Sequence, residues 1–167
     1  MFRKLALPVL AALAAACVDP SAPDLDAVAH EGLVLSMAVT PASISPGDTA
    51  RLVARLANHN GHAVRLDFPS GCQILPHVES AGGKVVYPYG GGWGCTLALT
   101  SLTLGPGEAR EQVLRWTGQS YDYDRKTFAP VYSPLPPGSY RAYAVLSGSY
   151  EGRRVELRSN TETVTVR

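Results

Sequence analysis

Residues 50–57 read Ala-Arg-Leu-Val-Ala-Arg-Leu-Ala, so that every second side chain is alanine or leucine. Between them stand Arg51 and Arg55, whose charges favour water. A period of two is typical of a β-strand with one buried face and one solvated face. The polar connection 58–62 follows, and its Asn60-Gly61 pair favours a hairpin turn into the alternating run 64–68. This stretch therefore predicts two paired antiparallel strands.

The same alternation recurs along the chain after residue 31, and no useful length of helical period accompanies it. Strands are expected at residues 33–40, 50–57, 64–68, 96–104, 108–116, 138–146, 155–157 and 161–166, with a proline-containing edge or bulge at 73–79 and a short segment at 84–87. The 16 glycines and 13 prolines supply the turns between them. We therefore expect residues 32–167 to form an all-β, immunoglobulin-like antiparallel β-sandwich of about eight or nine strands.

Length and charge narrow the class of protein further. The chain has 167 residues, which suits one domain plus a leader. Hydrophobic residues make up 46% of it, and this fraction argues against wholesale disorder. The formal net charge of +1 argues against a nucleic-acid binder, because such a protein needs a basic face to displace counterions. We expect a monomer with no nucleic-acid partner.

The first residues have the pattern of an export signal. Arg3 and Lys4 precede an apolar run over residues 5–16, which ends in small residues directly before Cys17. This pattern resembles a bacterial lipobox and predicts a lipoprotein-type signal peptide over residues 1–17, with Cys17 as the lipidated residue. The alternative is an ordinary signal peptide cut after Ala16. Residues 18–31 are acidic and proline-containing, and they are expected to form a flexible tether. We expect an exported protein anchored in the cell envelope through lipid, or otherwise a soluble periplasmic or secreted one.

Two cysteines remain if Cys17 carries lipid. Cys72 and Cys95 then allow a single pairing, and disulfides persist in exported proteins. The alternative is that one of them acts as a nucleophilic thiol. We expect a structural disulfide between them.

The central block resembles a known domain family. Residues 64–71 (Val-Arg-Leu-Asp-Phe-Pro-Ser-Gly), Gln73 and residues 83–87 (Gly-Lys-Val-Val-Tyr) follow an asparagine-ended strand, as in the BsuPI-type intracellular proteinase inhibitor domain. The resemblance continues through residues 104–108, Trp116 and residues 135–140, and it covers about residues 48–147. Cys72 is an insertion into the Ser-Gly-Gln turn of that pattern. The resemblance implies an immunoglobulin-like fold and the inhibition of a proteinase.

The sequence holds no pattern of a catalytic site. It has no Gly-x-Ser-x-Gly elbow, no zinc-protease His-Glu-x-x-His motif and no phosphate-binding loop that opens a helix. His59 and His62 lie three residues apart on a turn, without the further ligands that a metal site needs. We therefore expect no enzyme activity, no cofactor and no metal.

Two aromatic segments are candidates for contact with a partner. The long stretch 118–137 has no clean period and carries Tyr121, Tyr123, Arg125, Lys126 and Phe128, residues of the kind found in binding loops. The alternative is a decorated loop with a short strand near residues 128–132.

The second candidate segment is the glycine-rich loop 88–94, which carries Trp93. Its alternative role is a connection whose tryptophan folds back on the sandwich. The expected partner is a protease or another envelope protein. The expected function is that of a non-catalytic lipoprotein acting by protein–protein contact, as a proteinase inhibitor or as an accessory protein that binds a partner at the membrane without inhibiting it.

Overall fold

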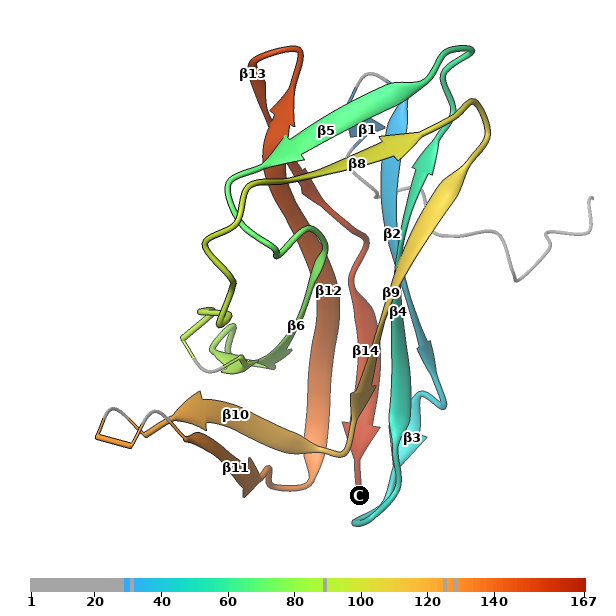
Figure 1. Cartoon of the computed structure of the whole chain (residues 1–167). Coiled ribbons are helices and arrows are strands. Elements are labelled where there is room, and N and C mark those ends of the chain that lie inside the picture. Colours follow the sequence, from blue (N-terminus) through green and yellow to red (C-terminus); the bar gives the residue numbers. More distant parts are fainter. Residues whose placement is uncertain (1–28, 31, 89, 125, 128) are drawn as a thin grey trace, which may run out of the picture.

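Two β-sheets face each other in the protein, and a separate hairpin extends from one end (Figure 1). A computed structural model describes residues 29–30, 32–88, 90–124, 126–127 and 129–167. The predicted signal peptide with Cys17 lies outside the described residues, as does most of the predicted tether. Within the tether range, Ala29 and His30 form a short strand, so the sheet begins there.

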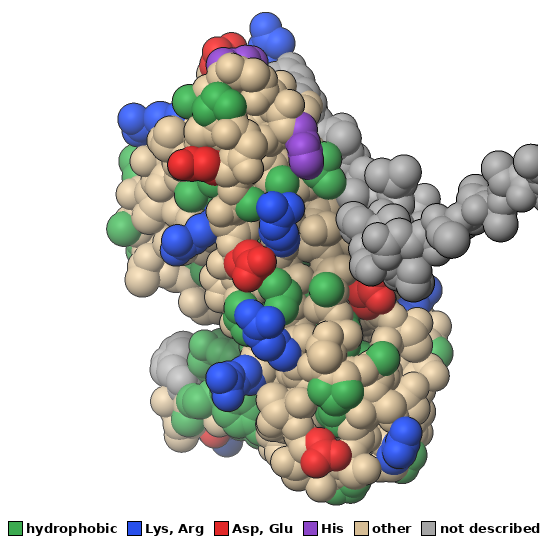
Figure 2. Space-filling view, turned by 90° about the vertical axis from the view of Figure 1, so that its right-hand side faces the viewer, with side chains coloured by type: hydrophobic (Ala, Val, Ile, Leu, Met, Phe, Trp, Pro, Cys, Tyr) green, Lys and Arg blue, Asp and Glu red, His purple; other side chains and the backbone are tan. Residues whose placement is uncertain are grey.

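The first sheet is built around the alternating segment that follows residue 49. It contains β1 (Ala29–His30), β2 (Leu33–Thr40), β4 (Ala50–Asn58) and β9 (Ala109–Trp116), in that order across the sheet. Leu52 and Leu56 of β4 are fully buried, whereas Arg51 and Arg55 are exposed, as the period of two requires. On the side shown in Figure 2, basic, acidic and hydrophobic side chains are interspersed.

The second sheet is organised by one long strand, β12 (Gly138–Tyr150). Its first half pairs with β14 (Glu162–Val166) and β6 (Leu75–Ser80), and its second half pairs with β13 (Arg153–Arg158) and β5 (Val64–Phe68). Around these lie β8 (Thr100–Leu104) beside β5, β7 (Val85–Tyr87) beside β6, and β3 (Ser43–Ile44), which is parallel to β14. The hairpin consists of β10 (Gln119–Tyr123) and β11 (Pro130–Pro134).

The core lies between the two sheets. Its largest fully buried side chains come from both of them and include Trp116, Phe68, Leu35, Leu52, Leu56, Leu66 and Leu146. Trp116 at the end of β9 meets the ring of Tyr140 in β12 edge-on, with centroids 5.9 Å apart. The Tyr140 hydroxyl donates to the Pro136 carbonyl at 2.7 Å, four residues upstream. A tyrosine near the start of a strand that bonds back in this way is a hallmark of immunoglobulin-like sandwiches.

Two buried asparagines join segments that are distant in sequence. The Asn58 side-chain amide donates to the carbonyls of His62, Leu104 and Gly105 at 2.9–3.0 Å. Asn160 accepts from the Met37 backbone N–H at 2.8 Å and donates to the Met37 carbonyl at 3.0 Å, which ties the start of β14 to β2 across the sandwich. Both side chains are at most 4% exposed, and these bonds replace the water that they lost on folding.

The immunoglobulin-like antiparallel sandwich is confirmed, although the described residues divide it into fourteen strands instead of eight or nine. The pairing predicted for residues 50–57 and 64–68 is wrong, because β4 pairs with β2 and β9, whereas β5 pairs with β12 and β8 in the other sheet. The connection 58–62 therefore crosses from one sheet to the other instead of forming a hairpin.

The predicted strand 96–104 is shorter than expected, because β8 begins only at Thr100. The reason is a change of phase: Leu97 and Leu99 occupy odd positions, whereas Leu102 and Leu104 occupy even ones. One strand cannot place both pairs on the same face.

Candidate functional site

Tyrosine and tryptophan side chains gather where the hairpin meets the sandwich. Tyr121 lies at the centre, with ring centroids 5.3 Å from Tyr87, 6.2 Å from Trp93, 5.1 Å from Tyr123 and 5.4 Å from Tyr132. Only 8% of Tyr121 is exposed, and burial raises the pKa of its hydroxyl above the ordinary value. The aromatic cluster therefore holds the β10–β11 hairpin against the glycine-rich loop.

The predicted contact residues of this region have different surroundings. Tyr121 is buried and Trp93 is half-buried, so these two rings contribute chiefly to packing. Tyr123 is 39% exposed, and Lys126 is exposed with its backbone N–H donating to the Asp124 carboxylate at 2.8 Å. The remaining two, Arg125 and Phe128, lie outside the described residues. The strand β11 stands where a short strand was considered as an alternative to a binding loop.

A second feature follows directly from the disulfide. Cys72 and Cys95 are bonded, with their Cα atoms 5.5 Å apart, which confirms the expected pairing. Next to it, the Gly71 backbone N–H donates to the Thr96 carbonyl at 3.1 Å. A Cβ at position 71 would overlap the Thr96 hydroxyl, so a larger residue there would have to displace that side chain.

Residues 70–73 are also attached to the chain at Thr100, five residues after Cys95. The Thr100 hydroxyl donates to the Ser70 carbonyl at 2.7 Å, and the Gln73 side-chain amide donates to that hydroxyl at 3.2 Å. We call residues 95–100 the braced segment, because both of its ends are attached to residues 70–73. An ordered segment of this kind loses less conformational entropy when it binds a partner.

Between these two attachments the side chains face solvent. Leu97 is 96% exposed and Leu99 is 83% exposed, more than any other large hydrophobic side chain of the described residues. Leu99 also borders a groove of about 630 Å³ with Phe68 and Pro69. This surface was not predicted from the sequence, because both leucines fall within the expected strand 96–104; the change of phase before Leu102 is the signal that separates them from it.

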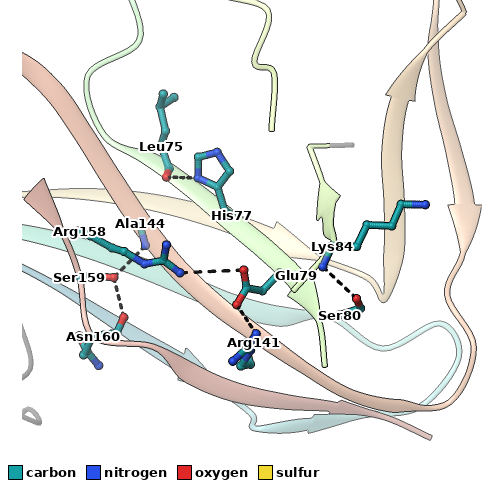
Figure 3. A network of polar contacts seen from close by, with 10 residues as sticks. All are labelled: Leu75, His77, Glu79, Ser80, Lys84, Arg141, Ala144, Arg158, Ser159 and Asn160. Atoms are coloured by element: carbon teal, nitrogen blue, oxygen red, sulfur yellow. Dashed lines mark hydrogen bonds and ion pairs between the residues drawn. The ribbon is translucent and has the colours of Figure 1, made fainter. Parts of the chain in front are cut away.

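The outer face of the second sheet carries a buried acid between two arginines (Figure 3). Glu79 in β6 is 8% exposed, and its carboxylate lies 2.8 Å from the Arg141 guanidinium and 4.0 Å from that of Arg158. Both arginines are half-exposed, so the acid is neutralised without a fully buried base. An acid so buried needs such partners, and this arrangement supplies a structural ion pair.

A stack of side chains continues this network. His77 packs parallel to Tyr143 with centroids 5.3 Å apart, and the Arg158 guanidinium lies 3.7 Å from the centre of the same tyrosine ring on β12. Burial lowers the pKa of His77 below 6.5, since desolvation disfavours the charged imidazolium. The neutral ring donates a hydrogen bond from Nδ1 to the Leu75 carbonyl oxygen at 2.9 Å (Figure 3). These contacts explain the histidine as a packing residue.

In the described part of the chain, no group of three or more histidine, cysteine, aspartate or glutamate side chains is arranged to hold a metal ion. The same residues contain no helix with the length and apolar character to cross a membrane. The features that remain for contact with a partner are the aromatic cluster and the braced segment.

A family comparison agrees with this geometry. The model of the family described as "BsuPI: Intracellular proteinase inhibitor" matches residues 37–151, from β2 through the end of β12. The chain belongs to this family. The BsuPI match confirms the resemblance inferred from residues 64–87 and 104–140, and it includes the disulfide, the aromatic cluster and the braced segment. The disulfide favours a non-cytoplasmic location for this BsuPI domain, although the family is described as intracellular.

Solved structures resemble the chain more distantly. The CARDB domain of a Pyrococcus furiosus protein, solved with di-metal ions, has 17% identity and a TM-score of 0.45, covering 81% of this chain and 87% of that one. The alkylpurine DNA glycosylase of Pseudomonas fluorescens has 15% identity and a TM-score of 0.42, covering 83% of this chain and 31% of that one. A β-glucosidase of Listeria innocua has 15% identity and a TM-score of 0.40, covering 80% of this chain and 16% of that one.

These likenesses carry no functional argument at such identities and TM-scores. The search of curated proteins gave no match.

Proposed function

We propose that this chain is a non-catalytic proteinase inhibitor that acts by protein–protein contact. The observation that carries the proposal is the BsuPI match, which spans residues 37–151 and so includes most of both sheets. The described surface adds ordered, exposed apolar residues of the kind that a rigid inhibitor presents to an enzyme, notably Leu97 and Leu99. Inhibitor complexes of proteases usually form with little backbone change, which suits a disulfide-braced sandwich.

Titration of the purified full chain against a panel of serine proteases tests this proposal. The panel contains enzymes that prefer apolar, basic and small side chains in the primary specificity pocket. We expect stoichiometric loss of activity for at least one class, with the chain uncut by intact-mass analysis of the mixture. Full activity of every enzyme at excess chain would contradict the proposal and favour an accessory protein that binds a partner without inhibiting it.

We further propose that the inhibitor is exported and anchored in the cell envelope through lipid on Cys17. Support comes from the basic start, the apolar run 5–16 and the small residues before that cysteine. The disulfide between Cys72 and Cys95 adds support, because such bonds persist in oxidising compartments.

Mass spectrometry of the N-terminal peptide from the native host tests the anchor. The expected peptide begins at Cys17 and carries acyl chains. An unmodified peptide that begins at Cys17, or a retained residue 16, would contradict lipidation, while a retained Arg3 and Lys4 would contradict export itself.

A further inference from the structure

The braced segment lies within the longest uncharged stretch of the chain. No lysine, arginine, aspartate or glutamate occurs from Val85 to Gly107, between Lys84 and Glu108. The chain as a whole has 29 such residues among 167, so a gap of this length is unusual. What this stretch itself offers to a partner is apolar, at Leu97 and Leu99, while Arg65, Asp67 and Arg154 of other strands line the groove beside Leu99.

The residues that the structure describes give no structural reason for the exposure of Leu97. A leucine side chain that is 96% exposed contributes nothing to the core, and Leu99 two residues later is nearly as exposed. Single exposed leucines are ordinary, but two that are separated by one alanine on a segment attached at both ends form an exposed apolar patch. The disulfide and the bonds of Thr96 and Thr100 keep this surface from folding back onto the sandwich.

We infer that residues 97–99 (Leu-Ala-Leu) are the segment that enters the protease cleft, with Leu97 filling the primary specificity pocket of a serine protease that prefers apolar side chains. This inference rests on the proposed function and assigns its contact site and target class. A hydrophobic slot accepts leucine, whereas a pocket with a carboxylate at its base selects lysine or arginine. Leu99 supplies the second apolar contact of the same segment.

The geometry suits substrate-like binding without a chemical step. Residues between Cys95 and Thr100 project from the protein while both of their ends are held, so little chain entropy is lost when an enzyme closes around them. The β10–β11 hairpin offers a rival surface with Tyr132, Val131 and Tyr123 exposed at 39–52%. It is less exposed than the leucines, and its central ring, Tyr121, is committed to packing.

The decisive experiment compares Leu97→Lys with the unchanged full chain on the same protease panel. We expect inhibition of apolar-specific enzymes to weaken by at least about 30-fold, the effect of losing a contact of about 2 kcal/mol. Inhibition of enzymes specific for basic side chains should appear in the variant, because lysine fits their carboxylate-containing pocket. Since Leu97 touches almost nothing, thermal unfolding should be unchanged.

Val131→Lys is the matched control, because it adds the same charge at an exposed apolar residue of the rival hairpin. We expect it to inhibit as the unchanged chain does. Weakened inhibition by this variant together with full inhibition by Leu97→Lys would overturn the inference and place the contact on the hairpin. In that case the proposed inhibitor function would stand.

Two further outcomes have distinct meanings. If the unchanged chain inhibits no enzyme of the panel, the proposed function and this inference both fail. Sedimentation of both proteins at several concentrations tests the other possible occupant, a second copy of the chain. If the unchanged chain is a dimer, and Leu97→Lys is a monomer that inhibits equally well, the inference is overturned and the leucines are assigned to self-association.

Discussion

Replacement of Trp116 by alanine is expected to lower the free energy of unfolding by about 4 kcal/mol, the usual cost of emptying a buried tryptophan site. Trp116 is 1% exposed and ends β9 in the first sheet, while its ring meets Tyr140 of the second sheet. The change leaves a cavity between the two sheets. It also removes the bond from the indole N–H to the Gln119 carbonyl, 2.8 Å long, at the entrance to the hairpin.

Urea unfolding followed by far-ultraviolet circular dichroism measures this effect. Trp93→Ala is the matched control, because that ring is half-buried and belongs to a loop that packs on Tyr121 outside the space between the sheets. We expect the control to lose clearly less stability than Trp116→Ala. Equal losses for the two variants would contradict the placement of Trp116 as a residue that joins the sheets.

Removal of the disulfide by Cys72→Ser with Cys95→Ser is expected to lower the free energy of unfolding by about 3 kcal/mol. The two cysteines are 23 residues apart, and a cross-link over such a distance restricts the unfolded chain by roughly this amount in the entropy model. The Cys95 end of the braced segment should also loosen, because only hydrogen bonds then attach the segment to residues 70–73. Inhibition of the protease should weaken by more than the decrease in the fraction of folded protein explains.

Denaturant unfolding of the double variant and of the oxidised protein measures the loss of stability. Titration of a protease with the folded variant measures the loss of inhibition. Reduction of the unchanged chain should reproduce both results, since it breaks the same bond without changing side-chain identity. An oxidised and a reduced protein of equal stability would show that the bond does not constrain the unfolded chain.

The strands and their buried faces were largely predictable, because alternation with a period of two residues indicates which side chains are buried. The alternation in residues 50–57 indicated β4, and the structure buries Leu52 and Leu56 while it exposes Arg51 and Arg55. Turn residues fixed the other boundaries in the same local way, as Asn60-Gly61 does before β5. The disulfide was predicted by assigning Cys17 to lipid, which leaves a single pairing, and by the persistence of disulfides in exported proteins.

The candidate site was predictable only in part. Tyr121 and Trp93 were proposed as contact residues from their types, but whether an aromatic ring packs or projects depends on its neighbours in space. The braced segment was missed because its leucines were counted with those of β8, and the change of phase between Leu99 and Leu102 was not given weight. Only the position of the 70–73 turn beside Thr96 and Thr100 revealed that the leucines are held outward.

The sequence by itself determined the strand class and the family, because periodicity and turn chemistry are local properties, and it predicted the pairing of Cys72 with Cys95 once Cys17 is assigned to lipid. The tertiary structure decided which strands neighbour β12 along its length, which asparagines join distant segments and which apolar side chains remain in water. These depend on contacts between residues far apart in the chain. Leucines at 97 and at 104 have the same chemistry, and only the surrounding fold leaves one exposed and buries the other.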